Sequence, residues 1–272
     1  MDLKKEKLDI IVLAGQSNAE GCGRGEVSEE FVPDERILLL NDEARPRFEN
    51  INGKDVFKLD DSGTMRVGVA EEPEDCLGKR GVFALGFAKH YVKNDLAAGR
   101  KALIVYAPAG GTGFARNEWG KGGCLYRRLC RMTDYALSLN PENRIVAFLW
   151  HQGECDSVEN VQFTPAERRV YYREKLSCML EDFKQKYGLK NMPFIAAGFC
   201  DEWYLQTKEP CDAVLAGTKD VCAAEKGAFV ETGGLLSNNR KTGNGDNIHF
   251  CRESQHILGD KYYEAYKKIA KA

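Results

Sequence analysis

The stretch Leu8-Asp9-Ile10-Ile11-Val12-Leu13-Ala14, followed at once by Gly15-Gln16-Ser17-Asn18, indicates the fold. Near-continuous apolar residues, rather than strictly alternating ones, are typical of a strand that is covered on both faces. Four further runs have this character, the last of them more weakly, at residues 101–107, 144–150, 193–199 and 228–231. The sequence therefore predicts four or five strands, most of them parallel, in one sheet.

Amphipathic segments lie between these runs, at residues 82–98, 125–139, 165–187, 213–225 and 253–270. The third has a clear start, because Thr164 is a good N-cap and Pro165 suits the first helical position. Alternating strands and helices predict an α/β fold with three layers, in which helices flank a mostly parallel central sheet. We expect a single domain over residues 1–272, with the polar segment at about 43–74 as a loop insertion.

Charge and cysteine content narrow the classes of function. Lys and Arg total 39 and Asp and Glu total 41, which gives a net charge of -2. The chain therefore lacks the excess of positive charge that is typical of proteins that bind nucleic acid or an anionic membrane. No apolar run approaches the roughly 18 to 20 residues that span a bilayer. The 10 cysteines are scattered without a C-x-x-C pair, and no signal-peptide pattern opens the chain. We expect reduced thiols and a cytoplasmic location, or secretion if a signal was removed.

Three polar clusters carry candidate chemistry. Ser17 follows the first strand, where it is either a nucleophile or a helix cap. The cluster at 150–156 follows the third strand, where buried polar groups need partners. Asp246 lies three residues before His249, so on one turn its carboxylate can hold one imidazole nitrogen and leave the other as a base. A surface ion pair is the alternative for these two residues.

Motifs for other chemistry are incomplete. The glycines at 113–123 do not have the spacing of a phosphate-binding loop, and no His-Glu-x-x-His is present. We therefore expect neither a metal nor a cofactor.

Four short motifs occur in a characteristic order along the chain: Gly-Gln-Ser-Asn at 15–18, Gly-Gly-Thr at 110–112, His-Gln-Gly-Glu at 151–154 and Asp-x-x-His at 246–249. Together they resemble the SGNH (GDSL-like) hydrolase superfamily. The closest resemblance is to its branch with carbohydrate esterase family six and the sialate O-acetylesterase-like proteins. The resemblance spans nearly the whole chain and implies an SGNH-hydrolase fold, similar to flavodoxin.

The resemblance implies that Ser17 is the nucleophile, His249 the base and Asp246 its orienting carboxylate. The backbone N–H groups of Ser17 and of a glycine at 110 or 111, taken as Gly111, would form the oxyanion hole. Gln152 would add a side-chain donor, in the place where the wider superfamily has an asparagine. Donors of this kind each contribute about 2.7–4 kcal/mol to an oxyanion transition state.

The substrate that the resemblance implies is an O-acetyl ester on a carbohydrate, such as acetylated xylan oligosaccharides or sialate. Candidate contacts with it are Gln16, Asn18 and Trp119, although Trp119 can equally be a packing residue. Glu154 is a candidate auxiliary carboxylate. Aromatic residues at 203 and 204 are further candidates for stacking on sugar rings.

Two other functions remain open at this point. A lipase or thioesterase on the same scaffold would need an apolar channel, against which the polar 43–74 segment argues. A carbohydrate-binding protein without catalysis would not need the nucleophile and base that the chain retains. The oligomeric state and the acetylated position on the sugar do not follow from the sequence.

Overall fold

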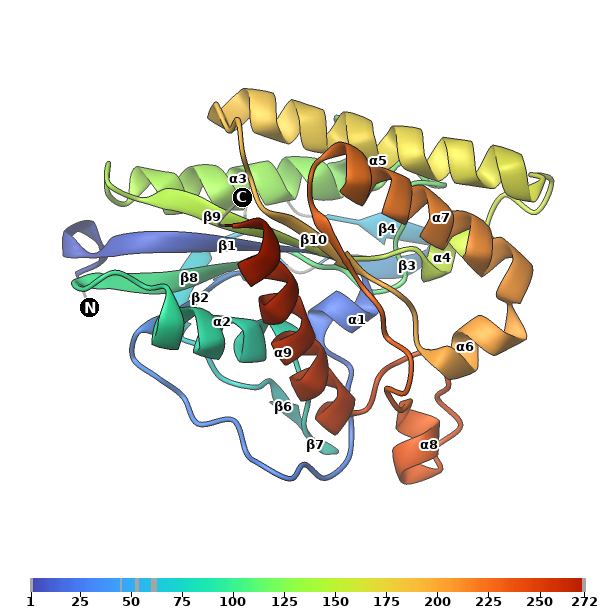
Figure 1. Cartoon of the computed structure of the whole chain (residues 1–272), viewed down its shortest axis with the longest axis horizontal. Coiled ribbons are helices and arrows are strands. Elements are labelled where there is room, and N and C mark those ends of the chain that lie inside the picture. Colours follow the sequence, from blue (N-terminus) through green and yellow to red (C-terminus); the bar gives the residue numbers. More distant parts are fainter. Residues whose placement is uncertain (1, 45, 52–53, 60–62, 271–272) are drawn as a thin grey trace.

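The structure is a computed structural model that describes residues 2–44, 46–51, 54–59 and 63–270. A seven-stranded sheet forms its middle layer, with the strand order β11-β10-β9-β1-β8-β2-β5 (Figure 1). These strands are β1 (Lys7–Gly15), β2 (Ile37–Asp42), β5 (Met65–Val69), β8 (Arg100–Tyr106), β9 (Arg144–His151), β10 (Phe194–Ala197) and β11 (Ala228–Val230). The central strand β1 runs parallel to both β8 and β9, whereas β5 is antiparallel to β2 at the edge.

Helices cover both faces of this sheet. The helices α3 (Cys124–Ser138), α5 (Pro165–Tyr187) and α7 (Lys208–Ala224) pack on one face, and α2 (Phe83–Asn94) and α9 (Arg252–Ile269) pack on the other (Figure 1). Side chains of β1 alternate between the two cores: Ile10 and Val12 face the first group of helices, and Ile11 and Leu13 face the second. The predicted three-layer α/β fold is confirmed.

Shorter elements connect these layers. They are the helices α1 (Ser17–Glu20), α4 (Glu154–Val158), α6 (Asp201–Gln206) and α8 (Asn238–Thr242), the 3-10 turn Leu3–Lys5, and the strands β3 (Arg47–Ile51), β4 (Lys54–Lys58), β6 (Glu74–Asp75) and β7 (Gly78–Lys79). Strands β3 and β4 form one antiparallel hairpin, and β6 and β7 form another.

The structure differs from the sequence prediction at one edge of the sheet. The 43–74 segment, predicted to be a loop, contains the β3–β4 hairpin and the edge strand β5, while residues 45, 52–53 and 60–62 of it lie outside the described residues. Strand β5 escaped prediction because its side chains are half-buried or exposed, so it has no apolar run. Strand β2, by contrast, carries the apolar run Ile37–Leu40, which the prediction overlooked.

The helices α5 and α7 illustrate how well local signals mark helix ends. Helix α5 begins where predicted, because Thr164 and Glu167 form a complete capping box, and it ends where predicted, where Gly188 takes the left-handed conformation of a C-cap. Helix α7 begins at Lys208, five residues earlier than predicted, because Pro210 falls in its first turn, where proline is tolerated.

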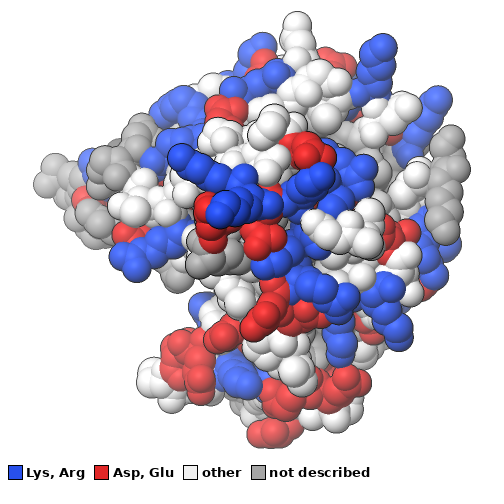
Figure 2. Space-filling model, turned by 90° about the vertical axis from the view of Figure 1, so that its left-hand side faces the viewer, with Lys and Arg blue, Asp and Glu red and all other residues white. Residues whose placement is uncertain are grey.

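Charged residues of both signs are mixed on the face at the amino ends of the strands (Figure 2). Beneath this face Asp9 is fully buried, and it accepts hydrogen bonds from Arg100 and Arg144 at 2.7 Å each. The polar clusters predicted from the sequence lie at the opposite edge, where β1, β8 and β9 end and where sites gather in such sheets.

Candidate active site

Ser17, His249 and Asp246 lie in one hydrogen-bonded chain. The Nε2 atom of His249 is 2.8 Å from the Ser17 hydroxyl, and its Nδ1 atom is 2.8 Å from Oδ2 of Asp246. Ser17 opens α1 directly after β1, whereas the other two residues lie on the loop between α8 and α9. The fold therefore brings Ser17 to two predicted residues that follow it by more than 200 positions in the chain.

Asp246 is held as a carboxylate by its neighbours. Asn238 of α8 donates to its Oδ2 at 2.8 Å, and the backbone N–H of His249 donates to its Oδ1 at 3.2 Å. Burial alone would raise the pKa of Asp246, but the hydrogen bonds from His249 and Asn238 outweigh it and lower the pKa to about 2. Asn238 was not predicted, because no motif links it to the loop it supports.

The segment that carries Ser17 depends on a close approach between β1 and β9. Gly15 has φ +132°, and a Cβ atom there would lie 2.1 Å from the carbonyl oxygen of His151. That same carbonyl accepts the backbone N–H of Gln16 at 2.9 Å. Only glycine fits this position, and the turn it makes delivers Ser17 to the end of the strand.

Two backbone N–H groups near Ser17 have no hydrogen-bond acceptor among the residues that the structure describes. The N–H of Ser17 is in the first turn of α1, where no intrahelical acceptor exists. Gly110 donates its N–H to Oε2 of Glu20 at 2.9 Å, whereas the N–H of Gly111 has no partner among the described residues. Of the two candidate glycines, Gly111 is therefore the one with a donor available.

Gln152 does not fit the predicted oxyanion role. The side chain is buried, and its Nε2 atom lies within hydrogen-bond distance of three acceptors: Oε1 of Gln16 at 3.1 Å, the carbonyl of Thr112 at 3.1 Å and Oδ2 of Asp156 at 2.7 Å. An amide has two hydrogens to donate, so none is left for a substrate. Gln152 instead joins the loop after β8 to α4.

Asn18 was predicted to contact the substrate, but the structure places its side chain in the interior. It is fully buried, and its Nδ2 donates to Oε1 of Glu154 at 2.7 Å and to the carbonyl of Ile248 at 3.1 Å. Its Oδ1 accepts the N–H of Phe250 at 3.1 Å. Asn18 thus joins the segment that carries Ser17 to the loop that carries His249, because its two backbone partners flank His249.

Glu154 is buried behind Asn18 and makes no hydrogen bond to His249. Burial raises the pKa of its carboxyl, and its Oε2 atom has no partner among the described residues. The carboxylate in contact with the imidazole is that of Asp246. The other predicted flanking residue, Gln16, is also buried, with its Oε1 accepting from Gln152, and its contact with substrate stays a prediction.

Trp119 is not available to a sugar. It is fully buried, packs edge-to-face against Trp150 at 5.3 Å between ring centroids, and donates its indole N–H to Thr112 at 3.0 Å. Trp203 is half-buried against the core, and the hydroxyl of Tyr204 donates to Asp212 at 2.7 Å. Trp119 is therefore a packing residue that fixes the loop after β8.

Further properties of the described residues bear on the kind of site. Within them, no group of three or more His, Cys, Asp or Glu side chains is placed to hold a metal ion. None of the described helices is both long enough and apolar enough to cross a membrane. All ten cysteines are free thiols.

Residues 7–268 match the model of the family described as carbohydrate esterase, sialic acid-specific acetylesterase. A protein of Arabidopsis thaliana described as a probable carbohydrate esterase is 26% identical over 264 residues, which cover 94% of this chain and 89% of that protein. A probable 9-O-acetyl-N-acetylneuraminic acid deacetylase of Escherichia coli is 27% identical over 108 residues, 39% of this chain and 32% of that protein.

Solved structures share the fold. The structure of NanS has a TM-score of 0.73 at 19% identity, and the match covers 98% of this chain and 98% of NanS. The structure of an Arabidopsis thaliana protein has a TM-score of 0.68 at 21% identity, and the match covers 96% of this chain and 98% of that protein. A lipase/acylhydrolase from Enterococcus faecalis has 0.51 at 10% identity, with 97% and 96% covered. The chain therefore belongs to the carbohydrate esterase family of sialic acid-specific acetylesterases, and it is a carboxylic ester hydrolase with the SGNH fold.

Proposed function

We propose that this protein removes O-acetyl groups from carbohydrates by a serine mechanism with an acetyl-enzyme intermediate. The observation that carries the proposal is the continuous contact from Ser17 Oγ through His249 to Asp246, with 2.8 Å at each step. A serine hydroxyl is a weak nucleophile until a neighbouring imidazole takes its proton. The substrate class is supported by the family to which the chain belongs.

In the first half of the reaction, His249 Nε2 takes the proton of Ser17 while Oγ attacks the acetyl carbonyl. The N–H groups of Ser17 and Gly111 stabilise the negative charge that develops on the carbonyl oxygen. The proton then passes from His249 to the sugar oxygen, the C–O bond of the ester breaks, and the acetyl group stays on Ser17.

In the second half, water takes the place of the sugar. His249 removes a proton from that water, the hydroxide attacks the acetyl-enzyme, and acetate leaves as Ser17 recovers its proton. Asp246 stabilises the imidazolium in both halves, since its lowered pKa of about 2 keeps it a carboxylate near neutral pH.

The test is hydrolysis of p-nitrophenyl esters of increasing acyl length, together with acetate release from acetylated xylo-oligosaccharides and O-acetylated sialic acid. We expect acetyl to be turned over faster than butyryl and octanoyl to be barely turned over, with no effect of EDTA. Ser17→Ala and His249→Ala should each lower kcat by about 10⁴–10⁶, and the double variant should be little worse.

The matched control is Ser138→Ala, on the exposed end of α3, which should keep wild-type turnover. Mass spectrometry of a rapidly quenched reaction should find one added acetyl group on the peptide with Ser17. Normal turnover by Ser17→Ala would contradict the mechanism, and a preference for octanoyl would favour a lipase.

A further inference from the structure

Glu20 joins the nucleophile helix to the loop after β8 at two points. It is the last residue of α1, three positions after Ser17. Its Oε2 atom accepts the backbone N–H of Gly110 at 2.9 Å, and its carbonyl oxygen accepts the hydroxyl of Tyr106, the last residue of β8. The segment that carries the nucleophile is therefore attached to both ends of the turn that leads to Gly111.

Gly110 packs closely against Glu20 and Ser17 of α1. A Cβ atom at Gly110 would lie 3.0 Å from Oε2 of Glu20 and 3.5 Å from Cβ of Ser17. Gly110 is not among the glycines with positive φ, so its backbone would accept alanine. The close contact with the Glu20 carboxylate, rather than backbone conformation, is what favours glycine at this position.

The peptide group before Gly110 and the one after Gly111 are held by different side chains, and the Gly110–Gly111 peptide, which carries the N–H of Gly111, lies between these two held points. Glu20 takes the N–H of Gly110 on one side, and the Arg116 guanidinium donates to the carbonyl of Gly111 on the other. Gly111 has φ +68°, a conformation from which a glycine can readily flip if its neighbours are released. These two contacts limit how the N–H of Gly111 can be aimed.

We propose that Glu20 is a positioning residue for the reaction, which acts by holding Gly110 so that the N–H of Gly111 faces the developing oxyanion. The proposal rests on the proposed function. It requires Glu20 only as a hydrogen-bond acceptor for the N–H of Gly110, and the negative charge of the carboxylate has no part in the role. Glutamine has a carbonyl oxygen at the same position and can replace it in this role.

The test compares Glu20→Ala with Glu20→Gln in the hydrolysis of p-nitrophenyl acetate. Because a displacement of a catalytic donor by about 1 Å can cost a factor of about 10², we expect Glu20→Ala to lower kcat by about 10- to 100-fold with little change in KM. Glu20→Gln should stay within about threefold of the wild type. The matched control is Glu26→Ala, which removes an exposed carboxylate of the following loop.

Two further readouts separate positioning from a general loss of structure. The pH profile of kcat/KM should be unchanged in Glu20→Ala, because His249 and Asp246 are not disturbed, and the unfolding midpoint should shift little. Gly110→Ala should impair the wild type but add no further loss to Glu20→Ala, since the side chain that it would displace is then absent.

Several results would overturn the proposal. The proposal is wrong if Glu20→Ala keeps the wild-type kcat, if Glu20→Gln loses as much activity as Glu20→Ala, or if the effects of Gly110→Ala and Glu20→Ala are additive. In each of these cases the wild type still hydrolyses the ester, so the proposed function stands. Absence of acetyl-ester hydrolysis by the wild type would instead overturn the proposed function, and the positioning role with it. If Glu20→Ala does not fold, Glu20→Asp, whose carboxylate is one methylene shorter, carries the same test.

Discussion

Asp246 and Glu154 are two carboxylates near the loop of His249, and their surroundings differ. Asp246 contacts Nδ1 of the imidazole directly and has its pKa lowered to about 2, where burial is outweighed by the hydrogen bonds it accepts. Glu154 is buried, has its pKa raised by that burial, and reaches the loop only through Asn18. These contacts favour Asp246 over Glu154 for the orienting role.

We expect Asp246→Asn to lower kcat by roughly 10⁴, because an asparagine leaves the imidazole in the wrong tautomer. Glu154→Gln should cost far less, about tenfold, since glutamine can still accept the hydrogen bond from Asn18. Both variants should be measured at the same pH, with folding checked by circular dichroism. A larger loss in Glu154→Gln would transfer the orienting role to Glu154.

Among the elements, helix α4 fixes the shape of the loop that follows β8. Asp156 of α4 is buried and accepts the N–H groups of Phe114 at 3.0 Å and Ala115 at 2.8 Å, together with Nε2 of Gln152 at 2.7 Å. The loop that these contacts hold also contains Gly111. The stability of the fold and the geometry of the site are therefore coupled through one carboxylate.

Asp156→Ala should destabilise the protein by about 3 kcal/mol or more, because it leaves buried donors unsatisfied at about 1–3 kcal/mol each. The kcat should fall as well, since the loop is released. Urea unfolding followed by circular dichroism, with esterase assays on the same samples, tests both effects. Thr164→Ala serves as the control: it should cost about 1 kcal/mol through the capping box of α5 and leave kcat unchanged. Unaltered stability in Asp156→Ala would show that the loop does not depend on α4.

Local sequence patterns account for the elements that could be predicted. The buried strands are continuous apolar runs, and the capping box of α5 lies within four residues, so both are visible without knowledge of the fold. The edge strand β5 is not, because its pairing with β2 rather than its own composition makes it a strand. Ser17, His249 and Asp246, which the structure brings into contact, could be singled out as candidates because each sits in a short motif. The wrong roles for Gln152 and Trp119 have one cause: burial and hydrogen-bond partners follow from packing between distant segments.

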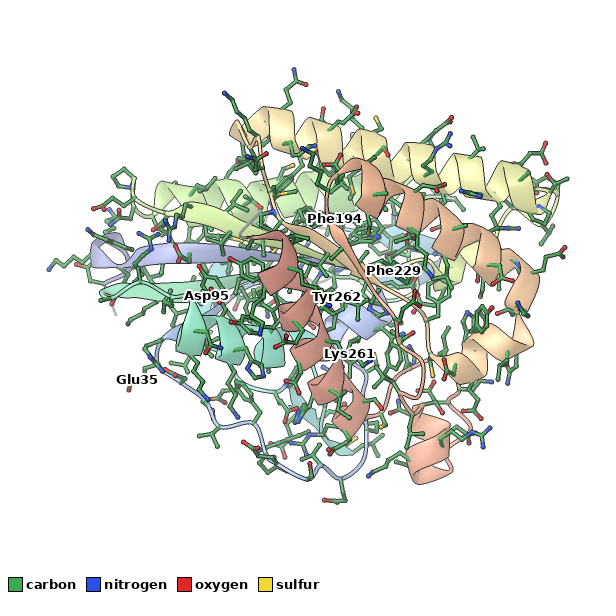
Figure 3. All side chains as sticks on the ribbon, viewed as in Figure 1. Glu35, Asp95, Phe194, Phe229, Lys261 and Tyr262 are labelled. Carbon is green, nitrogen blue, oxygen red and sulfur yellow. The ribbon has the colours of Figure 1, made fainter. Side chains whose placement is uncertain are left out.

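For the molecule as a whole, His151 links stability to pH. It is fully buried at the end of β9, with its ring between those of Phe83 and Phe250, and its Nε2 atom has no partner among the described residues. Its Nδ1 lies 3.2 Å from the hydroxyl of Tyr262, which points from α9 toward the sheet and donates to the carbonyl of Trp150 (Figure 3). Burial lowers the pKa of His151 to about 3, so the imidazole is neutral in the folded protein.

The sign of the pH effect follows from where the proton binds. Between an unfolded pKa of about 6.5 and the folded value, the unfolded chain holds a proton on His151 that the folded protein does not. The free energy of unfolding should therefore fall by about 1.4 kcal/mol for each pH unit below about 6.5, down to about 3. Glu154 and Asp156 act in the opposite direction, because a raised carboxyl pKa makes stability fall as pH rises.

A comparison of the wild type with His151→Asn isolates the contribution of the histidine, because the opposing carboxylates are present in both proteins. The variant carries no proton at this position at any pH, so the difference in unfolding free energy between the two should shift in favour of the variant by about 1.4 kcal/mol per pH unit from pH 6 to pH 4. Urea unfolding at half-unit pH steps measures it. If the difference in unfolding free energy between the two proteins stays constant with pH, His151 becomes protonated in the folded state as readily as in the unfolded chain. The buried Nε2–H group would then need a hydrogen-bond acceptor from the residues packed around β9 and α9.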